Sequence, residues 1–178
     1  SAYSTNIKTR CDFSCCFFDQ DLRAIAQSFS QPNHLGSLGG TVKQAIREYG
    51  IENLGPGDQL VVNYPYPGGA HLNDIVVIAP FYYLGEIFGY LGNLAHHVDV
   101  GGGAPASVGA FREIYQEGVI IPPVKIMQAG KIVEDVFQLI ISQIRSKRET
   151  AGDFRAQFAA NNTGVRRLTA LLDGYETE

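Results

Sequence analysis

The sequence predicts a single α+β domain, in which a mixed or antiparallel central sheet is flanked by helices. Two apolar segments, residues 75–83 and 86–94, have the composition of buried strands and are separated by two residues. So short a connection forms an antiparallel hairpin, because a parallel crossover takes about a dozen residues or more. Apolar residues at helical spacing occur toward both ends of the chain, so helices are expected to pack against this sheet.

The N-terminal third of the chain is predicted to form two short helices followed by a strand. Apolar side chains fall at helical spacing in residues 19–29 and again in residues 40–49, where Thr41 is a candidate N-cap. Residues 55–58, Gly-Pro-Gly-Asp, are typical of a turn. The apolar, β-branched residues 59–63 that follow predict a strand.

The centre of the chain is predicted to alternate between strand and loop. A loop rich in Pro and Gly, residues 64–69, precedes the strand at 75–83, which Pro80 is expected to divide into two pieces. Gly85 marks the hairpin turn, and a glycine-rich loop at 101–105 follows the second strand.

The C-terminal part of the chain is predicted to be helical. One apolar stripe of helical period spans residues 132–144, and a second spans residues 154–172. Asp153 is placed to neutralise the positive start of the last helix. Since neither a repeat nor a change of composition divides the sequence, residues 1–178 are expected to form one domain.

The composition is that of a globular protein and argues against several classes of function. The chain is 45% hydrophobic and 18% charged, which provides for a hydrophobic core. Its net charge of −4 and scattered basic residues argue against nucleic acid as a partner. Neither a signal peptide nor an apolar run of about 18 to 20 residues is evident, so no membrane association is expected. The clustered Cys11, Cys15 and Cys16 lack disulfide-framework spacing and favour a reducing, cytoplasmic location.

Two short motifs carry the chemistry of the sequence. His71-Leu-Asn-Asp74 and His96-His-Val-Asp99 each place a carboxylate three residues after an imidazole, close to a predicted strand end and to glycines. Residues three apart on a regular strand point to opposite faces, so the backbone must leave the strand within each motif. Two imidazoles and one or two carboxylates brought together would be a ligand set for divalent Zn, Mn or Fe. The alternative is that each histidine is a hydrogen-bonded structural residue.

His71, Asp74 and His96 are therefore the candidate metal ligands. Three protein ligands leave coordination positions open, and an ion there can lower the pKa of a bound water or polarise a carbonyl group. His97 is a candidate catalytic residue, either behind the ligands or facing the substrate, because adjacent residues rarely bind the same ion. Asp99 completes the second motif and is a further candidate catalytic residue.

Other side chains are weaker candidates. Glu117, one helical turn after Glu113, is a candidate general base, although a solvated helix face would explain both residues. Taken alone, Asp12 is better explained as a helix cap than as a ligand. His34 is expected to be structural rather than catalytic, and the three cysteines are expected to be core thiols rather than metal ligands.

The sequence around both histidine motifs resembles the hydantoinase B/oxoprolinase family. This family includes the B subunits of ATP-dependent hydantoinases and lactamases and related subunits of acetone and acetophenone carboxylases. The resemblance is carried by residues 63–74, NYPYPGGAHLND, and residues 96–102, HHVDVGG. It covers nearly the whole chain and extends to further segments at residues 6–14, 34–37, 113–125, 152–157 and 164–168.

The resemblance implies that His71, Asp74 and His96 bind a divalent metal, with Asp12 as the candidate fourth ligand. It also implies an A-type partner subunit that uses ATP to phosphorylate a small cyclic amide or ketone, so ATP is expected on the partner of a hetero-oligomer. The B-type subunit would then complete ring hydrolysis or carboxylation. The chain looks like the N-terminal portion of such a subunit, because family members are much longer.

Three functions follow from these expectations. The first is a metal-binding B-type subunit of an ATP-dependent cyclic-amide hydrolase, acting on a hydantoin, oxoproline or lactam. The second is a subunit of an ATP-dependent ketone carboxylase of the same family. The third is a non-catalytic structural fragment, which is suggested by the short chain and by Tyr64, where the family usually has aspartate.

Overall fold

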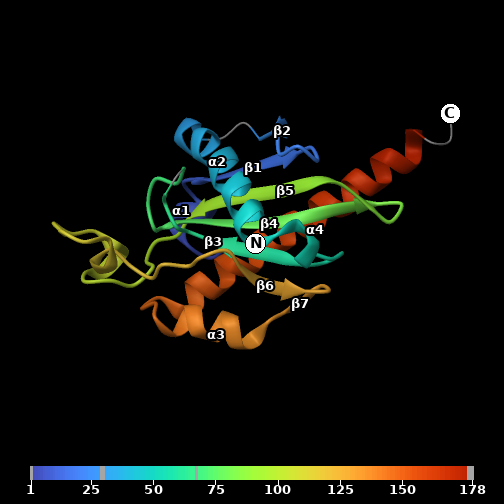
Figure 1. Ribbon diagram of the computed structural model, residues 1–178. Coiled ribbons are helices and arrows are strands. Elements are labelled where there is room, and N and C mark those ends of the chain that lie inside the picture. Colours follow the sequence, from blue (N-terminus) through green and yellow to red (C-terminus); the bar gives the residue numbers. More distant parts are fainter. Residues whose placement is uncertain (1, 29–30, 67, 176–178) are drawn as a thin grey trace.

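The fold is built on one seven-stranded antiparallel sheet, shown in a computed structural model that describes residues 2–28, 31–66 and 68–175 (Figure 1). The strand order is β2-β1-β5-β4-β3-β6-β7. The strands are β1 (Phe13–Phe18), β2 (Ala24–Gln27), β3 (Gln59–Val62), β4 (Asp74–Tyr83), β5 (Glu86–His96), β6 (Val124–Gln128) and β7 (Lys131–Ile132). The predicted α+β class with an antiparallel sheet is confirmed.

Helices cover both faces of this sheet. They are α1 (Thr5–Lys8), α2 (Pro32–Tyr49), α3 (Glu134–Ser142) and α4 (Lys147–Tyr175), with short 3-10 helices at Ile51–Asn53, Pro105–Ser107 and Ile114–Gln116. Helix α2 lies on one face, and α3 and α4 lie on the other. No helix in the described part of the chain is both long enough and apolar enough to cross a membrane.

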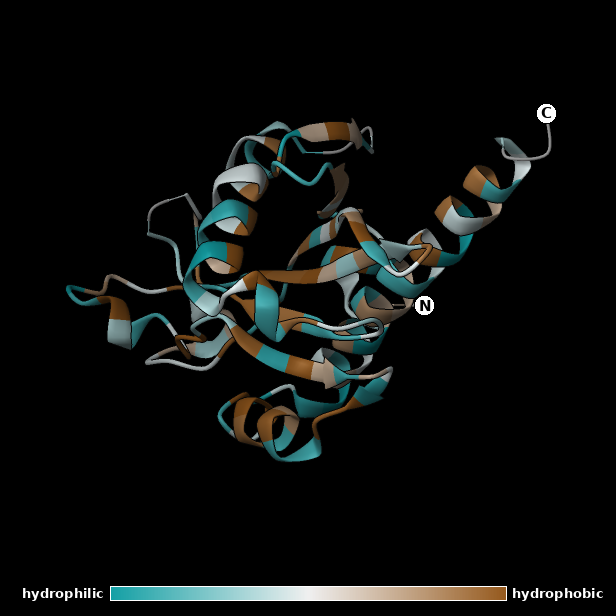
Figure 2. Ribbon diagram, turned by 45° about the vertical axis from the view of Figure 1, so that its right-hand side comes forward, coloured by the Kyte–Doolittle hydropathy of each residue, from teal (hydrophilic) through white to brown (hydrophobic). Residues whose placement is uncertain are grey.

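Two hydrophobic cores result from the alternation of side chains along the strands. Val76 and Ile78 of β4 pack under Val42 of α2, whereas Ile75 and Val77 pack on the other face with α3 and α4. In Figure 2 the central strands are largely brown, and teal and brown alternate along the C-terminal part of α4. Residues of even number in β4 therefore face α2, and this parity decides which polar groups meet at the strand ends.

Two predicted helices at the N-terminal side are corrected by the structure. Residues 19–29 do not form a helix, because Leu22 has a left-handed backbone and Arg23 donates to Asp19 across a tight turn. The chain therefore reverses into β2 beside β1, and Phe29 lies outside the described residues. Helix α2 begins at Pro32 rather than residue 40, since proline is well suited to the first helical position. Thr41 lies inside this helix and donates to the Ser37 carbonyl instead of capping it.

Two further expectations fail for local reasons. Pro80 does not divide β4, because β3 pairs with β4 only as far as Ile78 and the missing N–H faces no β3 partner there. Asp153 lies in the second turn of α4 rather than at its start, and it accepts hydrogen bonds from the backbone N–H groups of Tyr3 and Ser4. The predicted hairpin turn is present, with Leu84 and Gly85 both at positive φ.

Candidate metal centre

The candidate metal centre lies where β4 begins and β5 ends. Asp74 is directly opposite His96 in the antiparallel register, so both side chains point to the face covered by α2. His71 reaches the same place through a tight turn, in which the N–H of Asp74 donates to the carbonyl of His71 at 3.1 Å. The spacing of His71 and Asp74 thus reflects a turn at the start of β4. This turn places His71 beside Asp74, and strand pairing places His96, from the other end of the hairpin, opposite Asp74.

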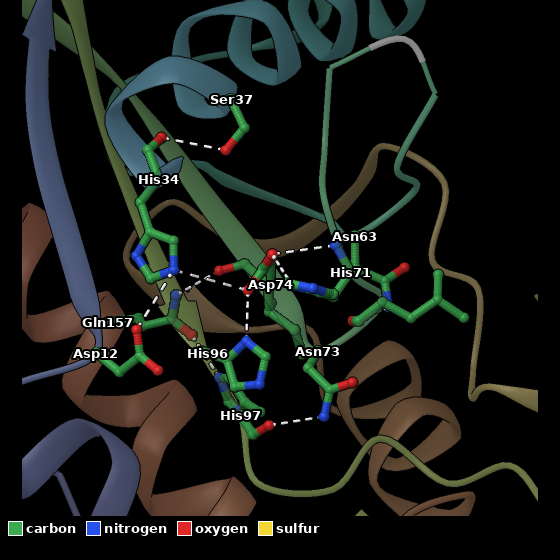
Figure 3. Close-up of polar contacts among 12 residues, drawn as sticks. Asp12, His34, Ser37, Asn63, His71, Asn73, Asp74, His96, His97 and Gln157 are labelled. Carbon is green, nitrogen blue, oxygen red and sulfur yellow. Dashed lines mark hydrogen bonds and ion pairs between the residues drawn. The ribbon is translucent and has the colours of Figure 1, made fainter. Parts of the chain in front are cut away.

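The three side chains meet around one carboxylate (Figure 3). His96 Nδ1 lies 2.7 Å from Asp74 Oδ1, and His71 Nδ1 lies 3.0 Å from Asp74 Oδ2. One ligand atom from each of these residues falls within 4.8 Å of the others. The Asp74 side chain is 1% exposed, whereas that of His71 is 58% exposed. The cluster therefore has a buried floor and an open, solvent-facing side.

The carboxylate and the imidazoles of the cluster stabilise each other's charged forms. Burial alone would raise the pKa of Asp74, but the hydrogen bond from His96 and the nearby imidazoles hold that pKa below its ordinary value. In return, the hydrogen bond to Asp74 raises the pKa of His96, against the opposing effect of burial. The site therefore favours a negative charge on Asp74 and a positive charge next to it.

This donor set fits a divalent transition metal. Two imidazoles and a carboxylate are the ligands that Zn, Mn and Fe accept in proteins, and the three donor atoms are already close enough to share one ion. A buried carboxylate that two imidazoles approach is also an environment in which a bound cation would replace protons. His71, Asp74 and His96 are thus able to hold such an ion.

Asp12 and His34 lie directly beside this cluster. His34, in the first turn of α2, has its Nε2 3.4 Å from Asp12 Oδ1 and 3.9 Å from Asp74 Oδ1. Asp12 immediately precedes β1, and its carbonyl accepts a hydrogen bond from the N–H of His96. Asp12 caps no described helix, since the N-caps of α1 and α2 are Ser4 and Gln31. The sequence did not predict that His34 lies beside the cluster, because the predicted helix started at residue 40, after His34.

His97 points to the opposite face of the sheet from His96. Its side chain is fully buried against Phe154, and its Nε2 lies 2.9 Å from Gln157 Oε1. Both N–H groups of the Gln157 amide donate to Ile75 and Asn93, so the amide oxygen accepts from His97. The structure therefore does not bring His97 to the open side of the cluster, and it packs behind the ligands.

Asp99 belongs to a loop and does not join the cluster. Its carboxylate accepts hydrogen bonds from the backbone N–H groups of Gly101 and Ala106 and from Arg145. Burial would raise the pKa of Asp99, but these three donors hold it below its ordinary value. Asp99 thus fixes the shape of the loop after β5.

Glu117 lines a cleft of about 310 Å³ next to the metal candidates. Ala70 and Leu72, the two neighbours of His71, line the same cleft together with Phe111 and Arg112. Glu113 is occupied in a capping box with Gln116, which explains its position without a catalytic role. Glu117 is exposed to solvent, and its role as a general base stays a prediction.

Tyr64 lies against α2, and the cysteines are not among the mutually close ligand atoms of the described residues. Tyr64 packs edge-to-face with Tyr66 and lines a small hollow against α2. All three cysteines are free, and only Cys16 is buried, so the prediction of core thiols holds for that residue alone.

A family model with the description Hydantoinase B/oxoprolinase matches residues 1–178. The chain belongs to this family. An uncharacterized protein of Methanocaldococcus jannaschii is 44% identical over 98% of the chain and 32% of its own length. The caprolactamase subunit beta of Pseudomonas jessenii is 36% identical over 92% of the chain and 28% of that subunit. The resemblance seen in the sequence is confirmed, and this family membership supports a role of hydrolase type.

Two solved structures share the fold of this hydantoinase B family chain. The ATP-dependent caprolactamase from Pseudomonas jessenii matches with a TM-score of 0.87 and 35% identity, over 92% of this chain and 28% of that one. Nucleotide-free acetone carboxylase matches with a TM-score of 0.89 over 98% of this chain and 23% of that one, and its 21% identity shows the fold alone. The chain thus spans a third or less of the length of these relatives.

Proposed function

We propose that the chain is the metal-binding portion of a B-type subunit in an ATP-dependent cyclic-amide hydrolase. The observation that carries this proposal is the meeting of His71, Asp74 and His96 ligand atoms within 4.8 Å of one another at one end of the sheet. Asp12 is the proposed fourth ligand, because it lies on the same side of the sheet and contacts His34 next to Asp74. The family membership supports the hydrolase class.

A bound Zn, Mn or Fe would supply Lewis acidity toward a carbonyl group or a bound water. The residues of the chain would prepare the site for it. Asp74 orients both imidazoles from the buried floor, and His71 stands at the solvent-facing side beside the cleft that Glu117 lines. In this proposal Glu117 is the general base. His97 and Asp99 do not contact the substrate: His97 fixes the end of β5 through Gln157, and Asp99 fixes the loop that follows.

A partner subunit is part of the proposal. The relative from Pseudomonas jessenii is described as a subunit beta, and its solved structure as an ATP-dependent caprolactamase. We infer that this chain also acts in a hetero-oligomer, with ATP used by an A-type subunit and a small cyclic amide as substrate. The free cysteines are consistent with a cytoplasmic location for this assembly.

A ketone carboxylase is the second candidate function. The family resemblance of the sequence suggests it, and the fold shared with acetone carboxylase is compatible with it, although a shared fold assigns no function. With the A-type subunit and ATP supplied, ring opening of a lactam or hydantoin would support the hydrolase, whereas incorporation of labelled bicarbonate into a ketone would support the carboxylase. A thermal shift with metal but no turnover of either kind would support a structural fragment, which is the candidate that Tyr64 suggests.

The decisive experiment is metal analysis of the purified protein. We expect close to one divalent ion per chain in the wild type and loss of that ion in His71→Ala and His96→Ala. Asp21→Asn is a suitable control, because Asp21 is an exposed carboxylate in the turn between β1 and β2. Unchanged metal content in both histidine variants would end the proposal.

A further inference from the structure

His34 is a buried histidine that leaves one of its two ring nitrogens unpaired. The residue is 2% exposed under the first turn of α2, and Nδ1 finds no hydrogen-bond partner in the described part of the chain. Burying a polar atom without a hydrogen-bond partner destabilises a fold, so an apolar residue would suit this position better if packing alone decided it. The imidazole is therefore explained by what its other nitrogen does.

That other nitrogen faces two carboxylates. The nearest acidic atoms to His34 Nε2 are Oδ1 of Asp12 at 3.4 Å and Oδ1 of Asp74 at 3.9 Å. Carboxylate oxygens only accept, so Nε2 carries the proton and Nδ1 is left as the unpaired acceptor. Figure 3 shows the His34 ring entering the cluster from the α2 side, with Asp12 and Asp74 in front of it.

The backbone on both sides of this contact is held in place. Asp12 donates to the Asn6 carbonyl and accepts from the N–H of His96, which fixes its main chain against β5. The His34 carbonyl accepts from the hydroxyl of Ser37 within α2. What remains free is the rotation of the Asp12 side chain, and His34 is the side chain placed to restrict it.

Both Asp12 and His34 lie outside the group of mutually close ligand atoms, which among the described residues comprises His71, Asp74 and His96. To bind the ion, the Asp12 carboxylate would therefore have to be turned toward this group, and His34 is the side chain in contact with it. A group that touches the ligands without joining them has the position of an outer-shell partner. Such partners orient the ligands, and their loss typically weakens metal binding by about 10- to 100-fold.

We propose that His34 is a positioning residue that orients the Asp12 carboxylate toward the metal site through its Nε2–H group. The proposal rests on the metal site proposed above and adds to it the reason why Asp12, remote in sequence from the two histidine motifs, takes part. Helix α2 thereby contributes to a site whose ligands all come from the strands and their adjoining turns.

The test is the affinity of His34 variants for Zn²⁺, measured by competition with a chromophoric chelator. Zn²⁺ is a suitable probe because it binds such sites more tightly than Mn²⁺ or Fe²⁺. His34→Gln keeps an amide N–H near the position of Nε2, whereas His34→Asn places its amide near Nδ1 and His34→Leu has no donor. We expect His34→Gln to bind almost as tightly as the wild type, and the other two variants to bind about 10- to 100-fold more weakly.

A second measurement separates positioning from stability. If His34 acts through Asp12, then His34→Leu should weaken Zn²⁺ binding much less in an Asp12→Asn background than in the wild type. Circular dichroism of the metal-free variants checks that each is folded. Should His34→Leu not fold, the comparison of the two amide variants, which differ only in reach, carries the test.

Two results would overturn the proposal. Equal Zn²⁺ affinity in all His34 variants would make the residue purely structural, and equally weak binding by His34→Gln and His34→Leu would make His34 a direct ligand. A wild type that binds no Zn²⁺ would instead refute the metal site and the role of His34 together. The failure of this proposal alone therefore differs from the failure of the proposed function.

Discussion

The two His-x-x-Asp motifs have the same spacing but different structural roles. In the first, His71 folds back over Asp74 and both residues join the candidate metal centre. In the second, only His96 reaches that centre, while Asp99 is turned into the following loop and pairs with Arg145. The same spacing thus corresponds to a turn before β4 in the first motif and to the end of β5 and the following loop in the second.

The difference teaches that strand register, rather than the motif, selects the members of the site. Asp74 and His96 face each other because β4 and β5 pair at that position, and the parity of the strands turns both toward α2. Asp99 lies beyond the last residue of β5, so no pairing directs it to the same place. Three substitutions test this comparison, two at the motifs and one at the far end of the hairpin.

The largest effect is expected from exchanging Asp74 for asparagine. Asp74→Asn should weaken Zn²⁺ binding by more than about 100-fold, since losing even an outer-shell partner costs about 10- to 100-fold. Asp99→Asn, the matched control in the second motif, should bind Zn²⁺ as the wild type does. Chelator competition measures both, and comparable losses in the two variants would show that the motifs act alike.

Asp99→Asn should instead lower stability. Its carboxylate accepts from two backbone N–H groups and from Arg145, and one hydrogen bond to a charged group contributes about 1.5 to 3 kcal/mol. Asparagine keeps one acceptor oxygen, so the loss corresponds to about one such bond. We expect the free energy of unfolding at pH 7 to fall by about 2 kcal/mol, measured by urea denaturation of the metal-free protein. A loss as large in Asp21→Asn, at an exposed turn, would contradict this explanation.

The stability difference at Asp99 should also depend on pH. The pKa of Asp99 is lowered in the folded state from its reference value of 3.8 by its hydrogen bonds, which outweigh burial. Its contribution is therefore fully present above pH 3.8 and is lost as the pH falls through the lower folded-state pKa. Urea denaturation of wild type and Asp99→Asn at several acidic pH values should show the two curves converging. A constant gap would mean that the charge is not involved.

The smallest effect is expected at the far end of the same hairpin. Gly85 has φ of +87° in the turn between β4 and β5, and residues other than glycine adopt this backbone conformation at a cost in free energy. Gly85→Ala should reduce the free energy of unfolding by about 1 kcal/mol but leave Zn²⁺ affinity unchanged. Weaker Zn²⁺ binding in this variant would show that the register of the whole hairpin, rather than its site-proximal end, controls the metal centre.

The parts of the fold that the sequence predicted are those with strong local signals. The hairpin of β4 and β5 followed from two apolar segments around Gly85, and the C-terminal helices followed from long apolar stripes. Helix α2 was predicted too short because Gly36, Gly39 and Gly40 are poor helix formers. In the structure a β-carbon at Gly39 would meet Phe18 only at ordinary van der Waals distance, so packing does not require glycine there.

The candidate site was predictable only in part, because local sequence patterns do not show which remote segments meet. The spacing indicated that His71, Asp74 and His96 belong together, but no local pattern distinguishes Asp74 from Asp99. The place of His34 depends on where α2 begins and on which face of the sheet it covers. Contacts between segments that are remote in sequence decide both points, and propensity alone carries no information about them.

The antiparallel hairpin also has a consequence for the order of assembly. Asp74 and His96 are 22 positions apart, so their pairing closes a short loop at little entropic cost. Ser4 and Asp153, which tie the segment before Asp12 to α4, are 149 positions apart and close a far longer loop. During folding the inner pair is therefore expected to form early, whereas the tie between Ser4 and α4 forms only when two segments remote in sequence have met.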